Sequence, residues 1–288
     1  MLNAMSAARR VTFSSFALFN GPVKKALKDA ARRGAHVTVR LNGYAYNGGA
    51  IPARNRDAAR VLRAAGANAR VVHVSDTDGP GLHLKAAVCD GVAFLDDRNW
   101  LQVGDTVIRD DNPSDVSAIR NAASYHPARC RFVQLDKETA LQHECALLRS
   151  SAGHAIDVAT EEIGFSSIFY ALEELARHGA HPRLMISSRG LCGKYLTAAQ
   201  MLARAGVRVR VSAQSEKFAI AGCKRAWVGS ANATSTTHDA AQLDWGIRTG
   251  EQRIVHALQS RFRALWNDAA PLAARRRTVK TARGSGPA

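Results

Sequence analysis

Two stretches of the chain share one pattern of hydrophobic and polar positions. Residues 19–41 (FNGPVKKALKDAARRGAHVTVRL) and residues 164–186 (GFSSIFYALEELARHGAHPRLMI) each carry small and apolar residues at the i, i+3 and i+4 spacing of a helix. Both stretches then reach a Gly-Ala-His sequence, and a β-branched or apolar run follows. Because Gly34 and Gly179 suit helix C-terminal caps, each stretch predicts a helix followed by a buried strand.

The pattern continues in both places with another helix and another strand. Residues 55–74 (NRDAARVLRAAGANARVVHV) and residues 195–213 (YLTAAQMLARAGVRVRVSA) repeat the helical spacing, and Gly66 and Gly206 precede the next apolar run. Each half therefore predicts a β-α-β-α-β unit. The expected fold is α/β: two similar halves packed as a pseudo-dimer, with mostly parallel sheets flanked by helices. An interface between such halves is a natural place for a site.

The two halves are expected to meet near residues 145–155, where a predicted helix passes through a Ser/Gly turn into a new strand. We divide the chain into a first half (1–150), a second half (151–272) and a basic tail (273–288). The early apolar segment VTFSSFALF is interrupted by serines, so we expect a strand there and not a signal peptide. Nowhere does the chain reach about 18 consecutive apolar residues, which argues against a membrane span and favours a cytoplasmic or peripheral membrane location.

Composition adds an expectation about partners. The chain is 46% hydrophobic and 22% charged, which is typical of a soluble globular protein, and its net charge of +16 favours an anionic partner such as nucleic acid, a membrane surface or a phosphorylated substrate. The tail carries five basic residues and no acidic one. We expect it to be disordered, and it acts either as a tether to an anionic membrane or nucleic acid or as a solvated tail. The five cysteines form no CxxC pair, so no zinc site or disulfide framework is expected.

Candidate chemistry lies in the segment LHLKAAVCDGVAFLDDRNW, residues 82–100. His83 and Lys85 are two residues apart on an extended segment, so both side chains point to the same face. The apolar run AAVC, the Asp-Gly turn and the run VAFL predict a hairpin. A histidine can act as a nucleophile or general acid near neutral pH, and a neighbouring lysine can neutralise a phosphate oxygen.

The whole pattern, His83-x-Lys85-x4-Asp90 followed by Asn99 and Trp100, resembles the HxKx4D signature of the phospholipase D superfamily. The duplicated α/β organisation resembles that family too, over about residues 10–270. The resemblance implies that one motif histidine attacks phosphorus and becomes a phosphohistidine, while the other protonates the leaving alcohol and later activates water. It makes His83 the nucleophile and Lys85 and Asn99 phosphate ligands, with no metal or other cofactor. Asp90 completes the catalytic motif, as a support for the loops and not as a substrate contact.

The second copy of the motif is degenerate. Ser215, Lys217 and Gly222 occupy the offsets of His83, Lys85 and Asp90, and a Gly-Ser-x-Asn turn follows at residues 229–232. By resemblance, Lys217 is catalytic, and Ser230 and Asn232 bind phosphate. A serine hydroxyl is too weakly acidic to replace an imidazolium as proton donor. Since such assistance is typically worth about 10²–10⁴-fold, the change predicts slow turnover.

The first copy has lost the Gly-Ser part of this turn instead. It reads Asp-Asp-Arg-Asn at residues 96–99. If Asp96 or Asp97 points inward, its carboxylate repels a phosphate or steadies His83.

Several other polar residues are possible auxiliaries. Ser215, His238 and Asp244 are the candidates for an auxiliary role in the site. His238 lies either at the interface between the halves or as an exposed histidine in a loop. Asp244 falls where the family often has a glutamate near the site. Glu161 and Glu162 are either near the site or an acidic pair at a helix N-terminus. Tyr44 and Tyr46 either line the substrate entrance or lie in a loop without a role in the site.

Three functions follow from these observations. The leading one is a phospholipase D-like hydrolase or phosphatidyltransferase of lipid metabolism, because two motif copies in one chain resemble the bacterial phospholipase and cardiolipin-synthase branches. A nuclease is the alternative favoured by the net charge of +16, although only 6% of residues are aromatic and no basic stretch is interleaved with aromatics. The third is a weak or inactive protein that binds a phosphate-containing ligand. No obligatory protein partner is evident.

Overall fold

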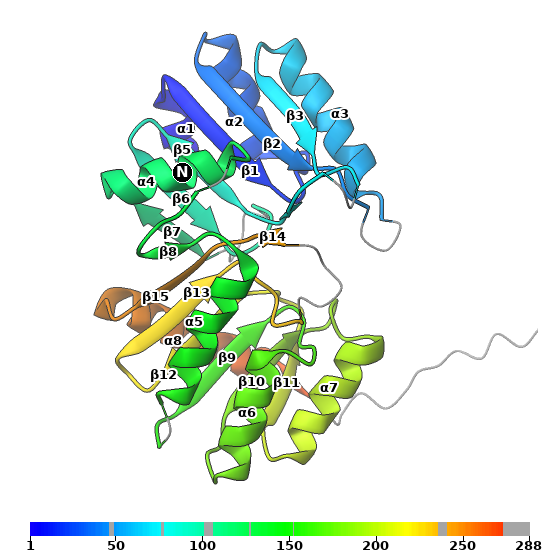
Figure 1. The fold of residues 1–288 in the computed structure, drawn as a ribbon, viewed down its shortest axis with the longest axis vertical. Helices are drawn as coiled ribbons and strands as arrows, with labels where there is room; N and C mark the ends of the chain where they lie inside the picture. The colour runs from blue at the N-terminus through cyan, green and yellow to red at the C-terminus, as the bar shows by residue number, and fades with distance from the viewer. Residues whose placement is uncertain are drawn as a thin grey trace, which may run out of the picture.

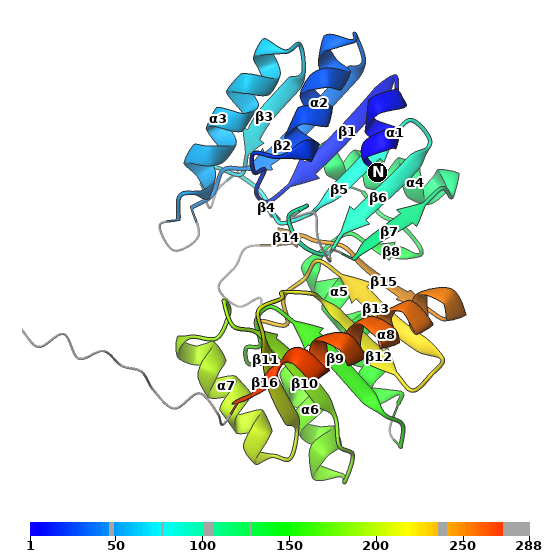
Figure 2. The ribbon, with the colours of Figure 1, turned by 180° about the vertical axis from the view of Figure 1, so that it is seen from behind.

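The computed structural model of this protein describes residues 1–45, 49–75, 78–100, 106–126, 128–151, 153–235 and 241–272. Figures 1 and 2 show two helix-flanked sheets, one above the other along the long axis of the molecule. The upper body is built from the first part of the chain and the lower body from the second. The predicted α/β class and the similarity of the two halves are confirmed.

The first half forms a six-stranded sheet in the order β3-β2-β1-β5-β6-β7. The predicted β-α-β-α-β unit supplies the parallel strands, since β1 pairs in parallel with β2 and β2 with β3. The predicted hairpin then extends the sheet with antiparallel strands. The bounds are α1 Leu2–Ala7, β1 Arg10–Ser15, α2 Pro22–Arg32, β2 His36–Asn42, α3 Ile51–Ala64, β3 Asn68–Val72, β5 Ala86–Cys89, β6 Val92–Asp96, β7 Val107–Asp110 and α4 Pro113–Ala123.

The second half repeats this plan in an eight-stranded sheet, in the order β16-β11-β10-β9-β12-β13-β15-β8. Strands β9, β10 and β11 are parallel and the strands beyond them are antiparallel. Helices α5 and α6 cover one face of this sheet and α8 crosses the other (Figures 1 and 2). The bounds are β8 Val133–Gln134, α5 Lys137–Arg149, β9 Ile156–Thr160, α6 Ser167–Arg177, β10 Arg183–Ser187, α7 Gly193–Arg204, β11 Arg208–Ser212, β12 Phe218–Ala221, β13 Arg225–Gly229, β15 Gly246–Thr249, α8 Gln252–Asp268 and β16 Ala270–Pro271.

Local sequence explains where the repeated helices end. Gly34 and Gly179 follow the last turns of α2 and α6 with φ angles of 87° and 83°, which favour glycine and close the helix. Asp90 and Gly91 form the two-residue turn of the predicted hairpin between β5 and β6. The division of the chain at residue 150 stays a prediction, and α5, which precedes that position, packs on β13 and β15 of the second sheet.

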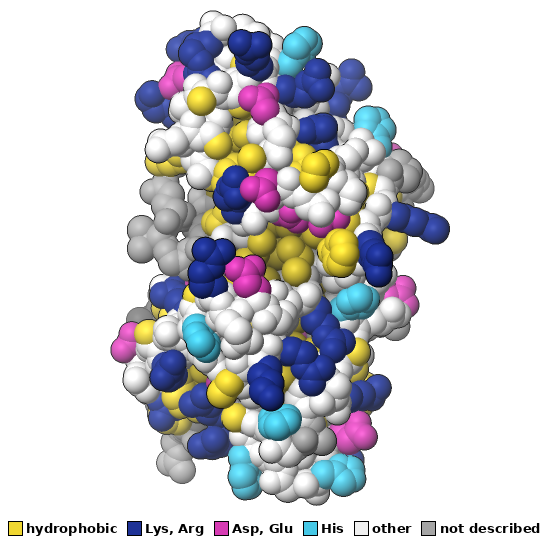
Figure 3. Space-filling view, turned by 90° about the vertical axis from the view of Figure 1, so that its left-hand side faces the viewer, with side chains coloured by type: hydrophobic (Ala, Val, Ile, Leu, Met, Phe, Trp, Pro, Cys, Tyr) yellow, Lys and Arg dark blue, Asp and Glu magenta, His cyan; other side chains and the backbone are white. Residues whose placement is uncertain are grey.

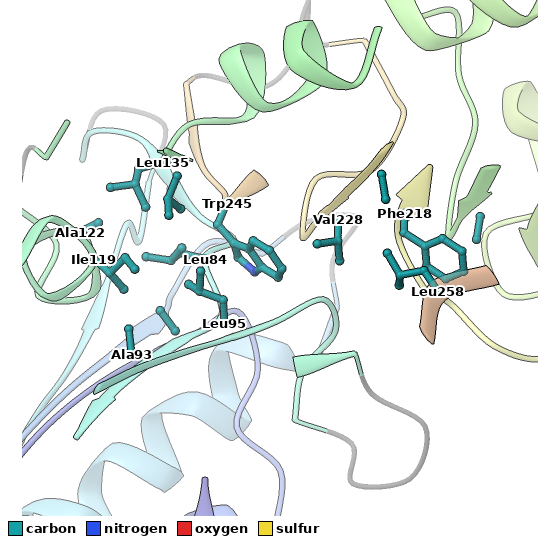
Figure 4. Close-up of a cluster of buried hydrophobic side chains, with 14 of the residues drawn as sticks. Leu84, Ala93, Leu95, Ile119, Ala122, Leu135, Phe218, Val228, Trp245 and Leu258 are labelled. Carbon is teal, nitrogen blue, oxygen red and sulfur yellow. The ribbon is translucent and has the colours of Figure 1, made fainter. Parts of the chain in front are cut away.

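One hydrophobic cluster joins the two halves (Figure 4). Leu84 and Leu95 of the first half and Val228 of the second lie around the fully buried indole of Trp245. The indole Nε1 of Trp245 donates a hydrogen bond of 2.8 Å to the Asp96 carbonyl of the first half. A continuous core of this kind holds the halves in one fixed relation, as a pseudo-dimer requires.

Three further expectations concern the rest of the chain. No helix in the described ranges is both long and apolar enough to cross a membrane. All five cysteines are free, and Cys192 and Cys223 are exposed. The basic tail, residues 273–288, lies outside the described residues.

Candidate active site

Two very short strands, one from each half, build the centre of the site. β4 (Gly81–Leu82) and β14 (Gln242–Leu243) pair in parallel, with Leu82 opposite Leu243. The ladder continues beyond them, because the amide of His83 donates to the Leu243 carbonyl at 3.0 Å. The residues that follow the two strands are His83 and Asp244. The pairing therefore sets these two side chains beside each other although they are 161 residues apart in the chain.

His83 is held by a chain of hydrogen bonds. Its Nδ1 lies 2.7 Å from Asp244 Oδ1, and its Nε2 lies 2.8 Å from Lys85 Nζ. A carboxylate only accepts, so Asp244 requires the proton on Nδ1 and leaves the lone pair on Nε2. The ring of Phe16 packs edge-on against the imidazole with centroids 5.2 Å apart. The imidazole is thus fixed in one orientation, with its nucleophilic nitrogen defined.

The charges around His83 maintain this state near neutral pH. Burial and the neighbouring Lys85 ammonium lower the pKa of His83, so the ring is neutral at pH 7. Burial lowers the pKa of Lys85 to about 7. Burial alone would raise the pKa of Asp244, but His83, Lys85 and the hydroxyl of Ser230 lower it to about 2. Asp244 is therefore a carboxylate beside a neutral imidazole over the whole physiological range.

The degenerate copy takes up equivalent positions across the junction. The Lys85 carbonyl accepts from the Asp96 amide at 3.0 Å, and the Lys217 carbonyl accepts from the Gly229 amide at 3.1 Å. The strand registers place Glu161, which follows β9, where the first half has Phe16. An apolar ring that packs on His83 in the first copy is thus replaced by a carboxylate in the second.

This replacement determines the state of Lys217. Its Nζ lies 3.1 Å from Glu161 Oε2 and donates to the carbonyls of Asp97 and Ser215 at 3.1 and 3.2 Å. An ammonium has three protons, so these three partners satisfy it. Burial opposes the charge, but Glu161 and Asp97 raise the pKa of Lys217, and Lys217 in turn lowers that of Glu161 against its own burial. Lys217 is therefore a cation whose charge is already balanced by the protein.

Asp97 lies inward, at the position that Ser230 has in the other copy. Its Oδ2 accepts from the Lys217 amide at 3.2 Å and its Oδ1 from the Thr106 amide at 3.0 Å. Burial raises its pKa to about 7. Ser230 instead accepts from the Trp245 amide at 3.0 Å and donates to Asp244 Oδ1 at 2.6 Å. Of the two sequence alternatives for Asp97, steadying His83 does not match these partners, because the carboxylate lies on the Lys217 side.

The two asparagines expected to bind phosphate also have protein partners. Asn232 Nδ2 donates to Glu162 Oε2 at 3.2 Å, and Asn99 Oδ1 accepts from the Ala17 amide at 3.3 Å. Burial and the neighbouring Glu161 raise the pKa of Glu162. Ser230 and Asn232 are therefore placed at the junction, each hydrogen-bonded to a carboxylate.

The structure brings some of the predicted residues together and not others. His83, Lys85, Ser215, Lys217, Ser230, Asn232 and Asp244 surround the junction. Asp90 lies at the other end of β5, where its carboxylate accepts from the Arg9 and Arg10 amides, so it supports the β5–β6 turn and does not join them. Tyr44 packs on His73 with ring centroids 5.1 Å apart. His238 and Tyr46 lie outside the described residues.

Sequence reasoning missed two features of this site. Phe16 was not singled out, and Glu161 was not assigned to Lys217. A residue-by-residue comparison of the ends of the two first strands, Ser15-Phe16 and Thr160-Glu161, carries the signal for both. Within the described ranges, no group of three or more His, Cys, Asp and Glu side chains is arranged to hold a metal ion.

A histidine and a lysine held at the junction of two similar α/β halves are the arrangement that the sequence resemblance to the phospholipase D superfamily implies. Residues 145–266 match the family model described as "Cardiolipin synthase, PLD-like domain". The sequence resemblance to the phospholipase D superfamily is confirmed by this match over residues 145–266. The fold is shared with solved structures over nearly the whole length of the chain. No curated protein matches the sequence.

Two solved structures share this fold over nearly all of the chain. Phosphatidylserine synthase of Haemophilus influenzae is similar with a TM-score of 0.66 at 8% identity, over 96% of this chain and 86% of that one. Polyphosphate kinase of Porphyromonas gingivalis is similar with a TM-score of 0.65 at 13% identity, over 97% of this chain. The match spans only 49% of the length of the kinase chain. At these identities the similarity concerns the fold alone.

Proposed function

We propose that this protein is a phospholipase D-like phosphodiesterase in which His83 forms a covalent phosphohistidine. The observation that carries the proposal is the chain Asp244–His83–Lys85, with contacts of 2.7 and 2.8 Å across the junction. It presents a neutral imidazole with its lone pair on Nε2 and a lysine beside that nitrogen. These are the properties that a nitrogen nucleophile needs to attack phosphorus.

The reaction proceeds in two displacements. In the first, the Nε2 lone pair of His83 forms a bond to phosphorus, and the bond from phosphorus to the leaving oxygen breaks. In the second, water or an alcohol attacks phosphorus and loses a proton, and the electron pair of the P–N bond returns to Nε2. Asp244 stabilises the positive charge that develops on the imidazole during the first step. Lys85 stabilises the charge on the phosphoryl oxygens.

The leaving oxygen must receive a proton from another source. In an in-line displacement it departs on the side opposite to Nε2, and Lys85 lies on the Nε2 side. Ser215 is at the equivalent of His83 in the other copy, but its hydroxyl is not an acid near pH 7. Glu161 is no donor either, because Lys217 lowers its pKa. Asp97 has a pKa of about 7, but both of its carboxylate oxygens accept from backbone amides. Since this leaves no donor among the described residues, the proposal takes the proton from solvent, and the first step is slow for alcohols that leave poorly.

The balance of charge favours a diester over a monoester. Among the described residues, Lys85 forms no ion pair with a carboxylate, while Lys217 is paired with Glu161. One uncommitted cation matches the single negative charge of a phosphodiester. A monoester carries up to two charges near pH 7 and would face the carboxylates of Glu161, which is partly exposed, and of Asp244, which is buried. The site thus suits a substrate whose phosphate links two groups.

We propose a phospholipid as the substrate, with either hydrolysis or transfer to another alcohol. The description of the matched family names cardiolipin synthase, and the similar structure from Haemophilus influenzae is a phosphatidylserine synthase. Both are enzymes of phospholipid chemistry. A nuclease is the second candidate, favoured by the net charge of +16.

The proposal is tested with three substrates and two variants. Wild-type protein, His83→Ala and the control His256→Ala, which alters an exposed histidine on α8, are incubated with bis-p-nitrophenyl phosphate, phospholipid vesicles and single-stranded DNA. We expect product from the wild type and the control, with lipid product exceeding DNA product, and none from His83→Ala. Equal signals from all three proteins would contradict the catalytic assignment. Tight phosphate binding without turnover would make the protein a binding protein.

A further inference from the structure

One end of the neighbouring strands β13, β15 and β8 carries a hollow lined by arginines. Arg225 at the start of β13, Arg248 in β15 and Arg131, just before β8, line a hollow of about 320 Å³ together with Phe132 and His143. The register sets Arg248 opposite Trp227, so Arg225 lies on the same face, at the diagonal distance of about 7–8 Å. These side chains come from β13, β15, the segment that precedes β8 and helix α5, and they line the same hollow.

The positive charge of this hollow is not balanced by acidic side chains of its lining. No Asp or Glu lines it, and the three arginines form no ion pair with any of the residues that the structure describes. By contrast, Arg183 in β10 binds both carboxylate oxygens of Asp157 at 2.6 Å. Like charges held this close repel one another, and an external anion removes that cost.

The basic surface extends beyond the first hollow. Arg225 also lines a neighbouring hollow of about 730 Å³, which contains Lys224 and Arg263. Lys224 and Arg263 are exposed and form no ion pair with the described residues. The cations are therefore spread over the β13, β15 and β8 strand ends and the neighbouring part of α8 and do not converge on one point, which suits an extended anionic surface more than a single phosphate.

Exposed apolar side chains lie beside these cations. Phe132 is 56% exposed and packs under the Arg131 guanidinium, 5.4 Å from the ring centroid. Val107, the first residue of β7, is 41% exposed. Strands β7 and β8 lie side by side in both ribbon views (Figures 1 and 2). The space-filling view of this side shows a hydrophobic area in the middle, with Lys and Arg side chains gathered below it (Figure 3).

We propose that this arginine face, formed by Arg131, Phe132, Arg225 and Arg248, docks the protein onto an anionic lipid bilayer. Basic side chains attract acidic head groups, and neighbouring apolar side chains enter the boundary between head groups and acyl chains. A nucleic-acid strand fits less well, because Phe132 and His143 are the only aromatic rings among the described residues that line the first hollow, and a run of successive bases would need more. The inference goes beyond the proposed function, since docking does not depend on the chemistry at His83.

The test compares two variants of equal charge in the full-length protein. Arg131→Gln/Arg225→Gln/Arg248→Gln removes the arginine face, and Arg33→Gln/Arg56→Gln/Arg208→Gln removes three exposed, unpaired arginines elsewhere among the described residues. Binding is measured by co-sedimentation with phosphatidylcholine vesicles that contain about a third phosphatidylglycerol. At about fivefold for each basic side chain, the first variant should bind on the order of 100-fold more weakly and the control within about threefold of wild type. Phe132→Ser, which leaves the charge unchanged, should weaken binding chiefly at high salt.

The outcomes separate docking from catalysis. We expect His83→Ala to bind vesicles like the wild type, and the arginine-face variant to turn over soluble bis-p-nitrophenyl phosphate like the wild type. Equal losses in the two triple variants, or no binding of the wild type to anionic vesicles, would overturn the proposal. So would loss of oligo(dT) binding by the arginine-face variant with vesicle binding retained. Thermal melting of both triple variants establishes that each is folded.

Discussion

His83 Nδ1 lies 2.7 Å from Asp244 Oδ1, and the contact joins the two halves of the chain. It arises because the strands that immediately precede these residues, β4 and β14, pair in parallel. His83, the proposed nucleophile, comes from the first half and Asp244, which orients it, comes from the second half. Their contact can therefore form only when both halves have folded together. The proposed chemistry thus takes place at the junction of the two halves and also requires that this junction is formed.

Asp244→Asn tests the role of that carboxylate. An amide keeps the shape but can donate to Nδ1, which lets the imidazole take the wrong tautomer, and it does not stabilise an imidazolium. We expect kcat for bis-p-nitrophenyl phosphate to fall by about 10²–10⁴-fold with little change in thermal stability. Ser230→Ala removes one hydrogen bond to Asp244 Oδ1 and should cause a smaller loss. Wild-type turnover by Asp244→Asn would be incompatible with this role.

The pH profile of kcat/KM follows from two shifted groups. His83 must be neutral to attack, and its pKa lies below 6.5, so activity should rise with pH up to that range. Lys85 has a pKa of about 7 and loses its charge above it, so activity should then fall. The plot of kcat/KM against pH is therefore expected to be a narrow bell with its maximum close to neutral pH. In Lys85→Arg, which stays charged, the alkaline limb should disappear; a profile that still falls above pH 7 would assign that limb to another group.

Ser215→His is predicted to restore the proton donor. The gain should depend on the leaving group, since p-nitrophenolate leaves without protonation and an alkoxide does not. We expect turnover of a diester with an alkyl alcohol leaving group to rise by about 10²–10⁴-fold, and that of bis-p-nitrophenyl phosphate to change little. Ser215→Ala serves as the control and should resemble the wild type on both substrates. An equal gain on both substrates would point to a cause other than acid catalysis.

Glu161→Gln should convert Lys217 into a phosphate ligand. The variant removes the carboxylate that lies 3.1 Å from Lys217 Nζ and leaves a buried ammonium without its counter-ion. We expect inorganic phosphate to inhibit at least about tenfold more strongly, and the free energy of unfolding to fall by about 1–2 kcal/mol, because Glu161 is partly exposed. The control is Glu162→Gln, whose carboxylate binds Asn232 and not Lys217. Equal inhibition of both variants would contradict the assignment of Glu161 to Lys217.

Much of the fold was predictable because it depends on local patterns. The repeated helix–glycine–strand sequences predicted both β-α-β-α-β units, and the Asp-Gly turn predicted the hairpin after Lys85. The placement of His83 and Lys85 on one face followed from strand geometry. The pairing of β4 with β14 was not predictable, since each has only two residues and no hydrophobic pattern of its own. Asp244 was consequently only an auxiliary candidate.

The hydrogen-bond and ion-pair partners of Lys217 in the second motif could not be predicted from the sequence either. Lys217 was expected to be catalytic, and the structure gives it a carboxylate and two carbonyl partners. Whether a lysine faces a ligand or a protein carboxylate depends on which side chain ends the neighbouring strand, and Glu161 was equally compatible with a helix N-terminus. The inward position of Asp97 depends on the same three-dimensional context.

The most direct test of the central claim is to trap the intermediate on His83. With bis-p-nitrophenyl phosphate the first step needs no acid, whereas attack of water on the phosphohistidine lacks the base that a second histidine would supply. We predict a burst of about one p-nitrophenolate per chain followed by slow turnover. Intact-mass and peptide mass spectrometry should then place a p-nitrophenyl phosphoryl group on His83. Linear release without a burst, or an adduct on any other residue, would contradict the account.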